Sequence, residues 1–196
     1  MALIHDITTS ILVCLLVGSS VAQIISLGEC PVHPVVQNFD VAAYLGQWYQ
    51  IRRYEQTFER GGECSIAAYS LNEDGSVLVD NRMLVPPESE FRVEIGQAFL
   101  SFPEEDPLRG MLNVTFRGMP ADRLNYWVLD TDYERFAFVW NCQQVSDNIK
   151  AESFWLLSRT MALPESVMER VEELTDLYLD RSQIRPTQQD LEFCGN

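Results

Sequence analysis

Short apolar runs alternate with turn residues over most of the chain. The runs are rich in Val, Ile, Phe, Tyr and Trp, and residues such as Gly, Pro, Asn and Asp separate them. This spacing predicts about eight strands, which either pack as a sandwich or close into a barrel. The sequence Asn-Glu-Asp-Gly at 72–75 is typical of a hairpin turn. The expected strands are 46–55, 65–71, 76–85, 91–100, 110–117, 124–131, 135–143 and 152–159.

Alternation within a run predicts which side chains face the core, because successive side chains of a strand point to opposite faces. The third run places Asn81 on an otherwise apolar face, opposite Asp80 and Arg82. One face of the sheet is therefore expected to be apolar and the other to be in water. The apolar faces of the third, fourth and fifth runs are Val77, Val79, Asn81, Met83 and Val85; Phe91, Val93 and Ile95; and Leu112, Val114 and Phe116.

After the last run the apolar spacing changes to that of a helix. Pro164 suits a first helical turn, and acidic residues occupy the remaining positions of the segment that follows. We expect one amphipathic helix packed outside the sheet, with its acidic side in solvent. Its expected buried positions are Val167, Val171, Leu174 and Tyr178.

Eight antiparallel strands can close into a barrel whose interior holds one small ligand. Closure also removes exposed strand edges. A two-sheet sandwich gives much the same alternation, so the pattern alone leaves both architectures open.

The N-terminus has the features of a signal peptide. An uncharged run at residues 10–20 is too short to span a bilayer, and Ser-Val-Ala at 20–22 fits a signal-peptidase site. We expect residues 1–22 to be a signal peptide and residues 23–196 to form a single secreted domain. The lack of Lys and Arg before the run leaves a buried strand as the alternative. No second long apolar run follows, so no transmembrane segment or glycolipid anchor is expected.

Charge and cysteine content narrow the functional classes. The formal charge of −15 disfavours binding to nucleic acid or to anionic membranes. Four cysteines remain beyond the signal peptide, and their spacing does not fit a metal site, so we expect two disulfides and no metal. Four cysteines permit three pairings. They are Cys30, Cys64, Cys142 and Cys194.

Three short stretches together resemble the lipocalin family: Gly-Gln-Trp at 46–48, Thr-Asp-Tyr at 131–133, and Arg159 in the last strand. Each is weak alone, but their order and spacing in a chain of this length are specific. The likeness is strongest to the apolipoprotein D-like lipocalins, which include the insect bilin-binding proteins and Lazarillo. GECPVHPVVQNFDVAAYLGQWYQIRRYE, CSIAAYSL, NYWVLDTDYERFAFVWNC and SFWLLSRT carry it. It covers nearly the whole chain beyond residue 22.

The resemblance implies an all-β fold, an eight-stranded antiparallel up-and-down barrel (the calyx) with one C-terminal helix packed outside. At the closed floor, Trp48 and Arg159 would form a cation–π contact worth ~1–2 kcal/mol. The mouth would be lined by the loops at 56–64, 86–90, 117–123 and 144–151. The residues implied at the floor are Gly46, Trp48, Thr131, Asp132, Tyr133 and Arg159, and the implied disulfides are Cys30–Cys142 and Cys64–Cys194.

Five residues match lipocalin ligand positions: Tyr69, Asn81, Phe116, Tyr126 and Trp155. The alternative is that they fill a packed core. Asn81 discriminates between these interpretations, because a lone amide on an apolar face needs a partner, water or a ligand group. A cavity of this kind suits a mostly apolar ligand with one or two polar ends, such as a fatty acid, sterol, retinoid or bilin.

These features predict a secreted, non-enzymatic carrier for lipid transport, with no required cofactor and a bilin or lipid as its bound molecule. No nucleophile–base pair, phosphate loop or zinc motif is visible, and His33 is expected to be solvated. The alternatives are an extracellular interaction protein with a filled barrel and a lipocalin-type enzyme. The sequence specifies neither a cell-surface receptor nor a lipoprotein particle as a partner.

Three smaller features remain. Asn113 begins an Asn-Val-Thr glycosylation sequence and points outward. Met119, in an expected mouth loop, would be a sacrificial reductant for bound lipid peroxides and so protect against lipid oxidation. Arg52 and Arg53 are candidates to anchor a ligand carboxylate, but a bulge in their strand would change which of them faces inward.

Overall fold

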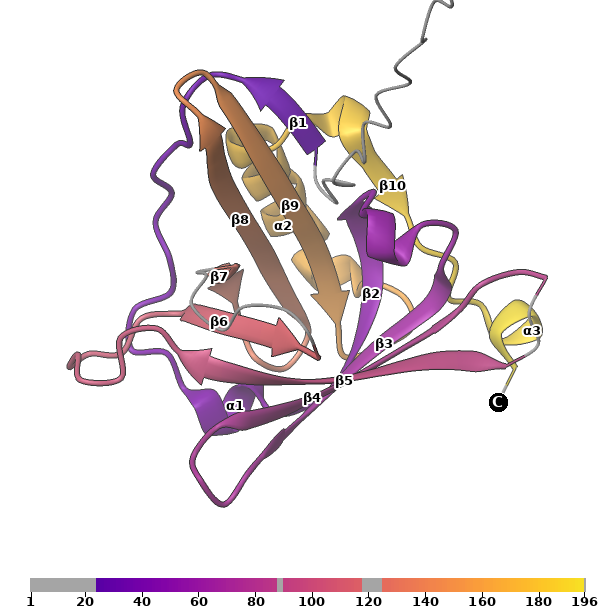
Figure 1. Ribbon diagram of the computed structural model, residues 1–196. Coiled ribbons are helices and arrows are strands. Elements are labelled where there is room, and N and C mark those ends of the chain that lie inside the picture. Colours follow the sequence, from indigo (N-terminus) through magenta and orange to yellow (C-terminus); the bar gives the residue numbers. More distant parts are fainter. Residues whose placement is uncertain (1–23, 88–89, 118–124, 196) are drawn as a thin grey trace, which may run out of the picture.

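The computed structural model describes residues 24–87, 90–117 and 125–195. The expected signal peptide, 1–22, and Met119 lie outside these residues. Eight antiparallel strands form an up-and-down barrel (Figure 1): each pairs with the next, and the last pairs back with the first. They are β2 (Gly46–Tyr54), β3 (Glu63–Leu71), β4 (Val77–Leu84), β5 (Phe91–Leu100), β6 (Met111–Phe116), β7 (Tyr126–Thr131), β8 (Phe136–Ser146) and β9 (Ile149–Ser158).

This closure settles the choice between barrel and sandwich. Two strands that the sequence did not predict extend the barrel sheet: β1 (Ile24–Leu27) and β10 (Ile184–Pro186). β9 pairs with β2 through residues 155–158 but with β1 through residues 149–152, and β2 pairs with β10 through residues 52–54. β1 therefore covers the edge of β9 that β2 leaves free, and β10 covers the edge of β2 beyond residues 46–49, where β2 pairs with β3.

The predicted C-terminal helix is confirmed as α2 (Glu165–Tyr178), which follows Pro164. Val167, Val171 and Leu174 are buried in a cluster with side chains from β8 and β9. Figure 1 shows α2 lying behind these two strands, outside the barrel. The short helical segments are α1 (Val41–Tyr44), the 3₁₀ turns η1 (Thr57–Glu59) and η2 (Arg181–Gln183), and α3 (Leu191–Cys194).

The predicted facing of the β5 strand is wrong. Phe91, Val93 and Ile95 were expected on the core side, but they are 39%, 49% and 51% exposed. The register pairs Asn81 with Glu94 and places Gly96 opposite Phe116, so the even-numbered residues face inward. A Cβ on Gly96 would lie 2.7 Å from the Phe116 ring, so only a glycine leaves room for that ring. Bulky apolar residues are common on surfaces, which is why hydrophobicity alone misassigned this strand.

The expected mouth loop at 144–151 is mostly strand. β8 continues to Ser146 and β9 begins at Ile149, so a two-residue turn at 147–148 joins them. This hairpin extends past the apolar part of the barrel, so most of its residues are polar. The sequence pattern therefore predicted a loop there.

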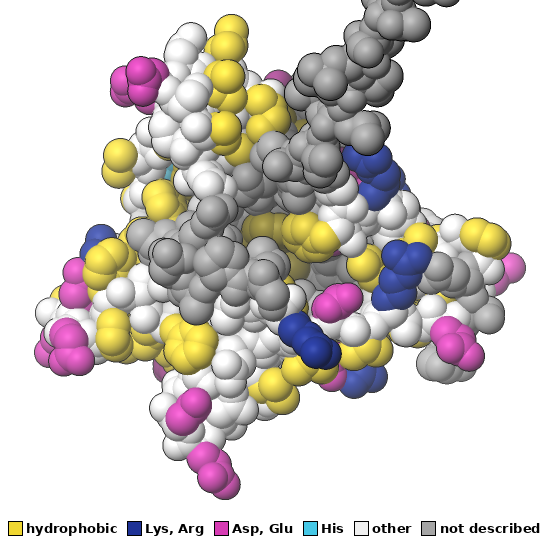
Figure 2. Space-filling model, viewed as in Figure 1, with side chains coloured by type: hydrophobic (Ala, Val, Ile, Leu, Met, Phe, Trp, Pro, Cys, Tyr) yellow, Lys and Arg dark blue, Asp and Glu magenta, His cyan; other side chains and the backbone are white. Residues whose placement is uncertain are grey.

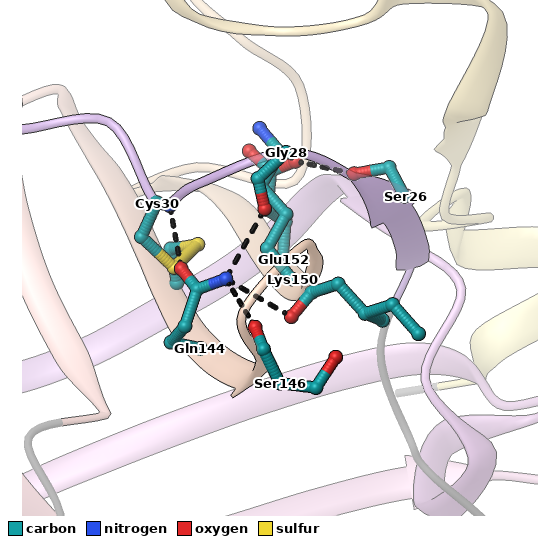
Figure 3. The surroundings of a disulfide bond; sticks show 9 residues. Ser26, Gly28, Cys30, Gln144, Ser146, Lys150 and Glu152 are labelled. Carbon is teal, nitrogen blue, oxygen red and sulfur yellow. Dashed lines mark hydrogen bonds and ion pairs between the residues drawn. A yellow bond between two sulfur atoms is a disulfide. The ribbon is translucent and has the colours of Figure 1, made fainter.

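Both disulfides implied by the resemblance are present: Cys30–Cys142 and Cys64–Cys194. The first fastens the N-terminal segment to β8. Figure 3 shows how Gln144 reinforces it: its side-chain oxygen accepts from the Cys30 backbone N–H at 2.8 Å, and its amide donates to the Gly28 carbonyl at 3.1 Å. Nearby, Glu152 accepts from the Ser26 hydroxyl and pairs with Lys150.

His33 is not solvated as expected. Its ring lies between those of Trp140 and Tyr178, at centroid distances of 4.5 and 4.6 Å. Burial lowers the pKa of His33, so at neutral pH the imidazole packs as an uncharged ring.

No helix in the described part of the chain is long and apolar enough to cross a membrane. Within the same residues, no group of three or more His, Cys, Asp or Glu side chains is placed to hold a metal ion.

Candidate ligand site

The closed end of the barrel contains a cation–π contact. The Arg159 guanidinium lies 3.6 Å from the Trp48 ring centroid, and Trp48 is fully buried. Arg159 also donates to three backbone carbonyls, those of Tyr133 at 2.9 Å, Gln47 at 3.0 Å and Ala43 at 2.9 Å. The side chain therefore ties β9 to β2, to α1 and to the β7–β8 turn.

The β7–β8 turn is organised by Thr131 and Asp132. The Thr131 hydroxyl donates to the Phe136 carbonyl at 2.6 Å, and Asp132 Oδ1 accepts from three backbone N–H groups of the turn. Tyr133 adopts a positive φ of 64°, which directs its hydroxyl to the backbone N–H of Asp40. This end of the barrel is thus held by buried rings and charge-assisted hydrogen bonds.

Replacing Gly46 by alanine is expected to destabilise the floor. Gly46 has φ = +92°, and a Cβ there would lie 3.3 Å from Arg159 Nη1. Backbone strain and the displaced guanidinium should together cost ~1–3 kcal/mol. Urea unfolding measures this loss, and Gly75→Ala, at an exposed turn with φ = +84° and no neighbour within 4 Å, isolates the cost of backbone strain. Equal losses in the two variants would contradict a close Gly46–Arg159 fit.

The five expected ligand positions all face the barrel interior. Tyr69, Phe116, Tyr126 and Trp155 pack against its apolar cluster, and Asn81 pairs across β4 and β5 with Glu94. All five are only partly buried, whereas Val79, Val139 and Leu157 in the same cluster are 2%, 0% and 4% exposed. The interior is therefore closed at some positions and accessible at others.

Three tyrosine hydroxyls meet inside the barrel. The Tyr126 hydroxyl lies 2.8 Å from that of Tyr44 and 3.1 Å from that of Tyr69. Burial raises the pKa of each well above the ordinary value, so all three stay protonated. Three O–H groups share two hydrogen bonds, which leaves one hydrogen able to reach a ligand oxygen. Tyr44, from α1, was not among the expected site residues.

Asn81 has an unsatisfied acceptor. Its Oδ1 is buried and has no hydrogen-bond partner among the described residues. A buried amide oxygen without a donor costs about 1–3 kcal/mol. A ligand that brings a donor would recover this free energy. The interior thus offers both a donor, from the tyrosines, and an acceptor.

The two arginines left unassigned by the sequence point in opposite directions. A bulge between Gln50 and Arg52 shifts the alternation of β2. Arg52 consequently points outward and pairs with Glu172 of α2 at 2.7 Å. Arg53 points inward, opposite Trp155, and is fully buried.

Arg53 links the mouth loop at residues 56–64 to the C-terminal segment. Its Nη1 donates to the Thr187 hydroxyl at 3.0 Å, and its Nη2 donates to the backbone carbonyls of Gly62 at 2.7 Å and Glu59 at 3.2 Å. Its Nε lies 3.6 Å from a Glu59 carboxylate oxygen without forming a hydrogen bond. The guanidinium is therefore occupied by protein groups, which leaves it poorly placed to anchor a ligand carboxylate.

Glu59, at the end of η1, reaches the same region. Its carboxylate oxygens lie 3.1 and 3.3 Å from Trp155 Nε1. Burial raises the pKa of Glu59 to about 7, although Arg53 and the Trp155 N–H both lower it. The sequence pattern did not predict Glu59 as a site residue, because it lies outside the strands, where alternation does not indicate which way a side chain faces.

Glu59 should make stability depend on pH. Because its pKa in the folded state lies above that in the unfolded state, its protonated form favours folding, and stability falls as pH rises from about 4.5 to 7. The Glu59→Gln variant lacks this titration, so it should gain ~2–3 kcal/mol relative to the wild type between about pH 4.5 and pH 8. Denaturant unfolding of both proteins at these two pH values measures the change. An equal difference at both would contradict the raised pKa.

Asn113 lies within β6, opposite Phe99, and its side-chain oxygen accepts from the Ser101 hydroxyl at 3.2 Å. This residue is half-buried on the outer surface. Its glycosylation stays a prediction.

Comparisons with known proteins give consistent relatives. A family model for the lipocalin-like domain matches residues 39–189. Apolipoprotein D of Oryctolagus cuniculus is 37% identical over 175 residues, 89% of each chain. The Lazarillo protein of Schistocerca americana is 32% identical over 190 residues, 95% of this chain and 86% of that protein. The solved structure of insecticyanin from the tobacco hornworm Manduca sexta has a TM-score of 0.74 at 23% identity, over 88% and 92% of the two chains, and shows the likeness of fold.

Proposed function

The chain belongs to the lipocalin family, and we propose that it is a secreted carrier that holds one small, mostly apolar ligand in its calyx. The observation that carries the proposal is the partial exposure of five inward-facing residues beside fully buried neighbours. Figure 2 shows one face of the molecule, with a recess at its centre and hydrophobic side chains inside the recess. A solidly packed barrel would bury such side chains completely.

The polar groups inside the barrel limit the chemical class of the ligand. One spare tyrosine hydrogen and the Asn81 oxygen match a molecule with one acceptor and one donor on an apolar frame. Sterols, retinoids and other neutral lipids have this chemistry. If ~300 Å² of apolar ligand surface is buried at ~25 cal/mol/Å², the gross gain is about 7–8 kcal/mol. Association costs reduce it, so micromolar affinity is expected.

Secretion is supported by the N-terminal apolar run and by the two disulfides, which persist in oxidising compartments. The protective role of Met119 towards lipid peroxides belongs to the same proposal. It predicts that Met119→Leu consumes lipid hydroperoxides more slowly than the wild type, and equal rates would exclude it.

Fluorescence titration tests the carrier function. Retinol, arachidonate and biliverdin are added separately, and at least one should quench tryptophan emission saturably. Trp155→Phe should remove most of this quenching, because Trp155 is the calyx tryptophan, and should weaken affinity by ~5-fold. Trp127→Phe is the control, since Trp127 packs with the cluster outside the barrel. Absence of saturable binding for all three ligands would count against a carrier.

A further inference from the structure

The Glu59 carboxylate has fewer hydrogen-bond donors than a buried carboxylate needs. Both of its oxygens lie near one N–H, that of Trp155, at 3.1 and 3.3 Å. An ionised carboxylate offers about four lone-pair positions. The Arg53 Nε, 3.6 Å away, has no hydrogen-bond partner and is itself fully buried. Two buried polar groups are therefore left incompletely satisfied at one place.

This place is on the calyx wall. Trp155 faces the interior and stacks on Tyr126, with ring centroids 6.4 Å apart and an interplanar angle of 19°. The Glu59 side chain is 12% exposed and lies close enough to Tyr69 to affect that residue electrostatically. A ligand packed against the Trp155 ring would thus come within reach of the carboxylate.

A purely structural ion pair with Arg53 does not account for this arrangement. The Nη atoms of Arg53 bind a hydroxyl and two backbone carbonyls, and none donates to the Glu59 carboxylate. Glu55 also approaches Arg53, at 3.9 Å, and pairs with Arg185 at 3.1 Å. The arginine is held by the backbone, while the Glu59 carboxylate keeps unused acceptor capacity.

We propose that Glu59 is a second polar subsite of the calyx, which accepts a hydrogen bond from a ligand hydroxyl or ammonium group and disfavours ligands that end in a carboxylate. This assignment rests on the proposed carrier function and deepens it. With this subsite, the calyx binds alcohols and amines more tightly than fatty acids. Without it, the calyx would bind all three classes equally.

Proton linkage accompanies this selectivity. The charged and titratable groups that face Glu59 are Arg53 and Glu55 from β2 and its end, and Tyr69 from β3. A ligand donor stabilises the ionised carboxylate and lowers the pKa of Glu59, so binding releases protons near neutral pH. A ligand carboxylate destabilises the ionised form of Glu59 and raises its pKa, so binding of such a ligand takes up protons.

Three ligands with one twelve-carbon chain test the subsite: dodecylamine, 1-dodecanol and dodecanoate. At about pH 8 the wild type should bind the amine and the alcohol ~10-fold or more tightly than the carboxylate. Glu59→Gln should reduce this preference to ~2-fold or less for the amine. Glu55→Gln is the matched control. The Glu55 carboxylate also lies near Arg53 but does not touch Trp155, so this variant should keep the wild-type preference.

Calorimetry of the wild type in buffers of different ionisation enthalpy provides a second readout that needs no variant. Proton release with dodecylamine and uptake with dodecanoate are expected. Saturable binding of all three ligands with no preference and no proton exchange would overturn the subsite while leaving the carrier intact. Failure of all three to bind would instead overturn the carrier function, and the subsite with it.

Discussion

Replacing Arg53 by methionine is expected to destabilise the protein by about 3–5 kcal/mol. The change removes a fully buried cation together with its hydrogen bonds to Thr187, Gly62 and Glu59. The Gly62 carbonyl loses the Arg53 donor, the buried Glu59 carboxylate loses its neighbouring cation, and the mouth loop at 56–64 loses its attachment to the C-terminal segment. Urea unfolding measures the loss of stability, and ligand titration should show weaker binding in the same variant.

The neighbouring arginine provides the control. Arg52→Met removes a partly exposed pair with Glu172, which should cost less than about 1 kcal/mol and leave ligand affinity unchanged. Similar losses for the two variants would contradict the opposite facing of these residues, and with it the bulge in β2.

Removing the Cys64–Cys194 disulfide should have an effect of similar size. Its cysteines are 130 residues apart, and the chain-entropy estimate for a loop of this length is about 4–5 kcal/mol. The disulfide fixes a segment whose Gln189 donates to the buried carbonyls of Gln50 and Ser65, and whose Thr187 holds Arg53. The Cys64→Ser/Cys194→Ser variant should therefore lose ligand affinity as well as stability.

The second disulfide is a matched control. Cys30 and Cys142 are 112 residues apart, so their replacement by serine releases nearly the same chain entropy. Cys30 is bonded to Cys142 of β8, a strand that does not pair with β2, which carries Arg53. Both variants should lose similar stability, but only the Cys64/Cys194 variant should bind ligand more weakly. Equal weakening would show that the C-terminal segment does not act through Arg53.

Most of the barrel could be predicted from sequence because alternation and turn residues mark strands with one buried face. The limits of the β5 strand were predicted correctly, but its facing was wrong, since Phe91, Val93 and Ile95 are surface residues and Gly96 faces inward. β1 and β10 have four and three residues, too few for a periodic pattern. They form because neighbouring edges need partners, which is a property of the fold.

The residues of the candidate site could also be predicted only in part from the sequence. The positions of Trp48 and Arg159 followed from a family resemblance, since residues 111 positions apart have no local signal that connects them. Arg53 faces inward only because of the bulge in β2, and Tyr44 and Glu59 enter the site from short helical segments outside the barrel strands. Such residues are placed by tertiary contacts, and strand periodicity carries no information about them.

The most direct test of a ligand-filled calyx is the indole ¹H–¹⁵N spectrum of tryptophan-labelled protein during ligand titration. The four tryptophans report separate places: Trp48 the floor, Trp127 and Trp140 the cluster outside the barrel, and Trp155 the calyx. Addition of a ligand that binds should shift the Trp155 signal while those of Trp127 and Trp140 stay in place. Shifts of Trp127 or Trp140 with Trp155 unchanged would contradict binding inside the barrel.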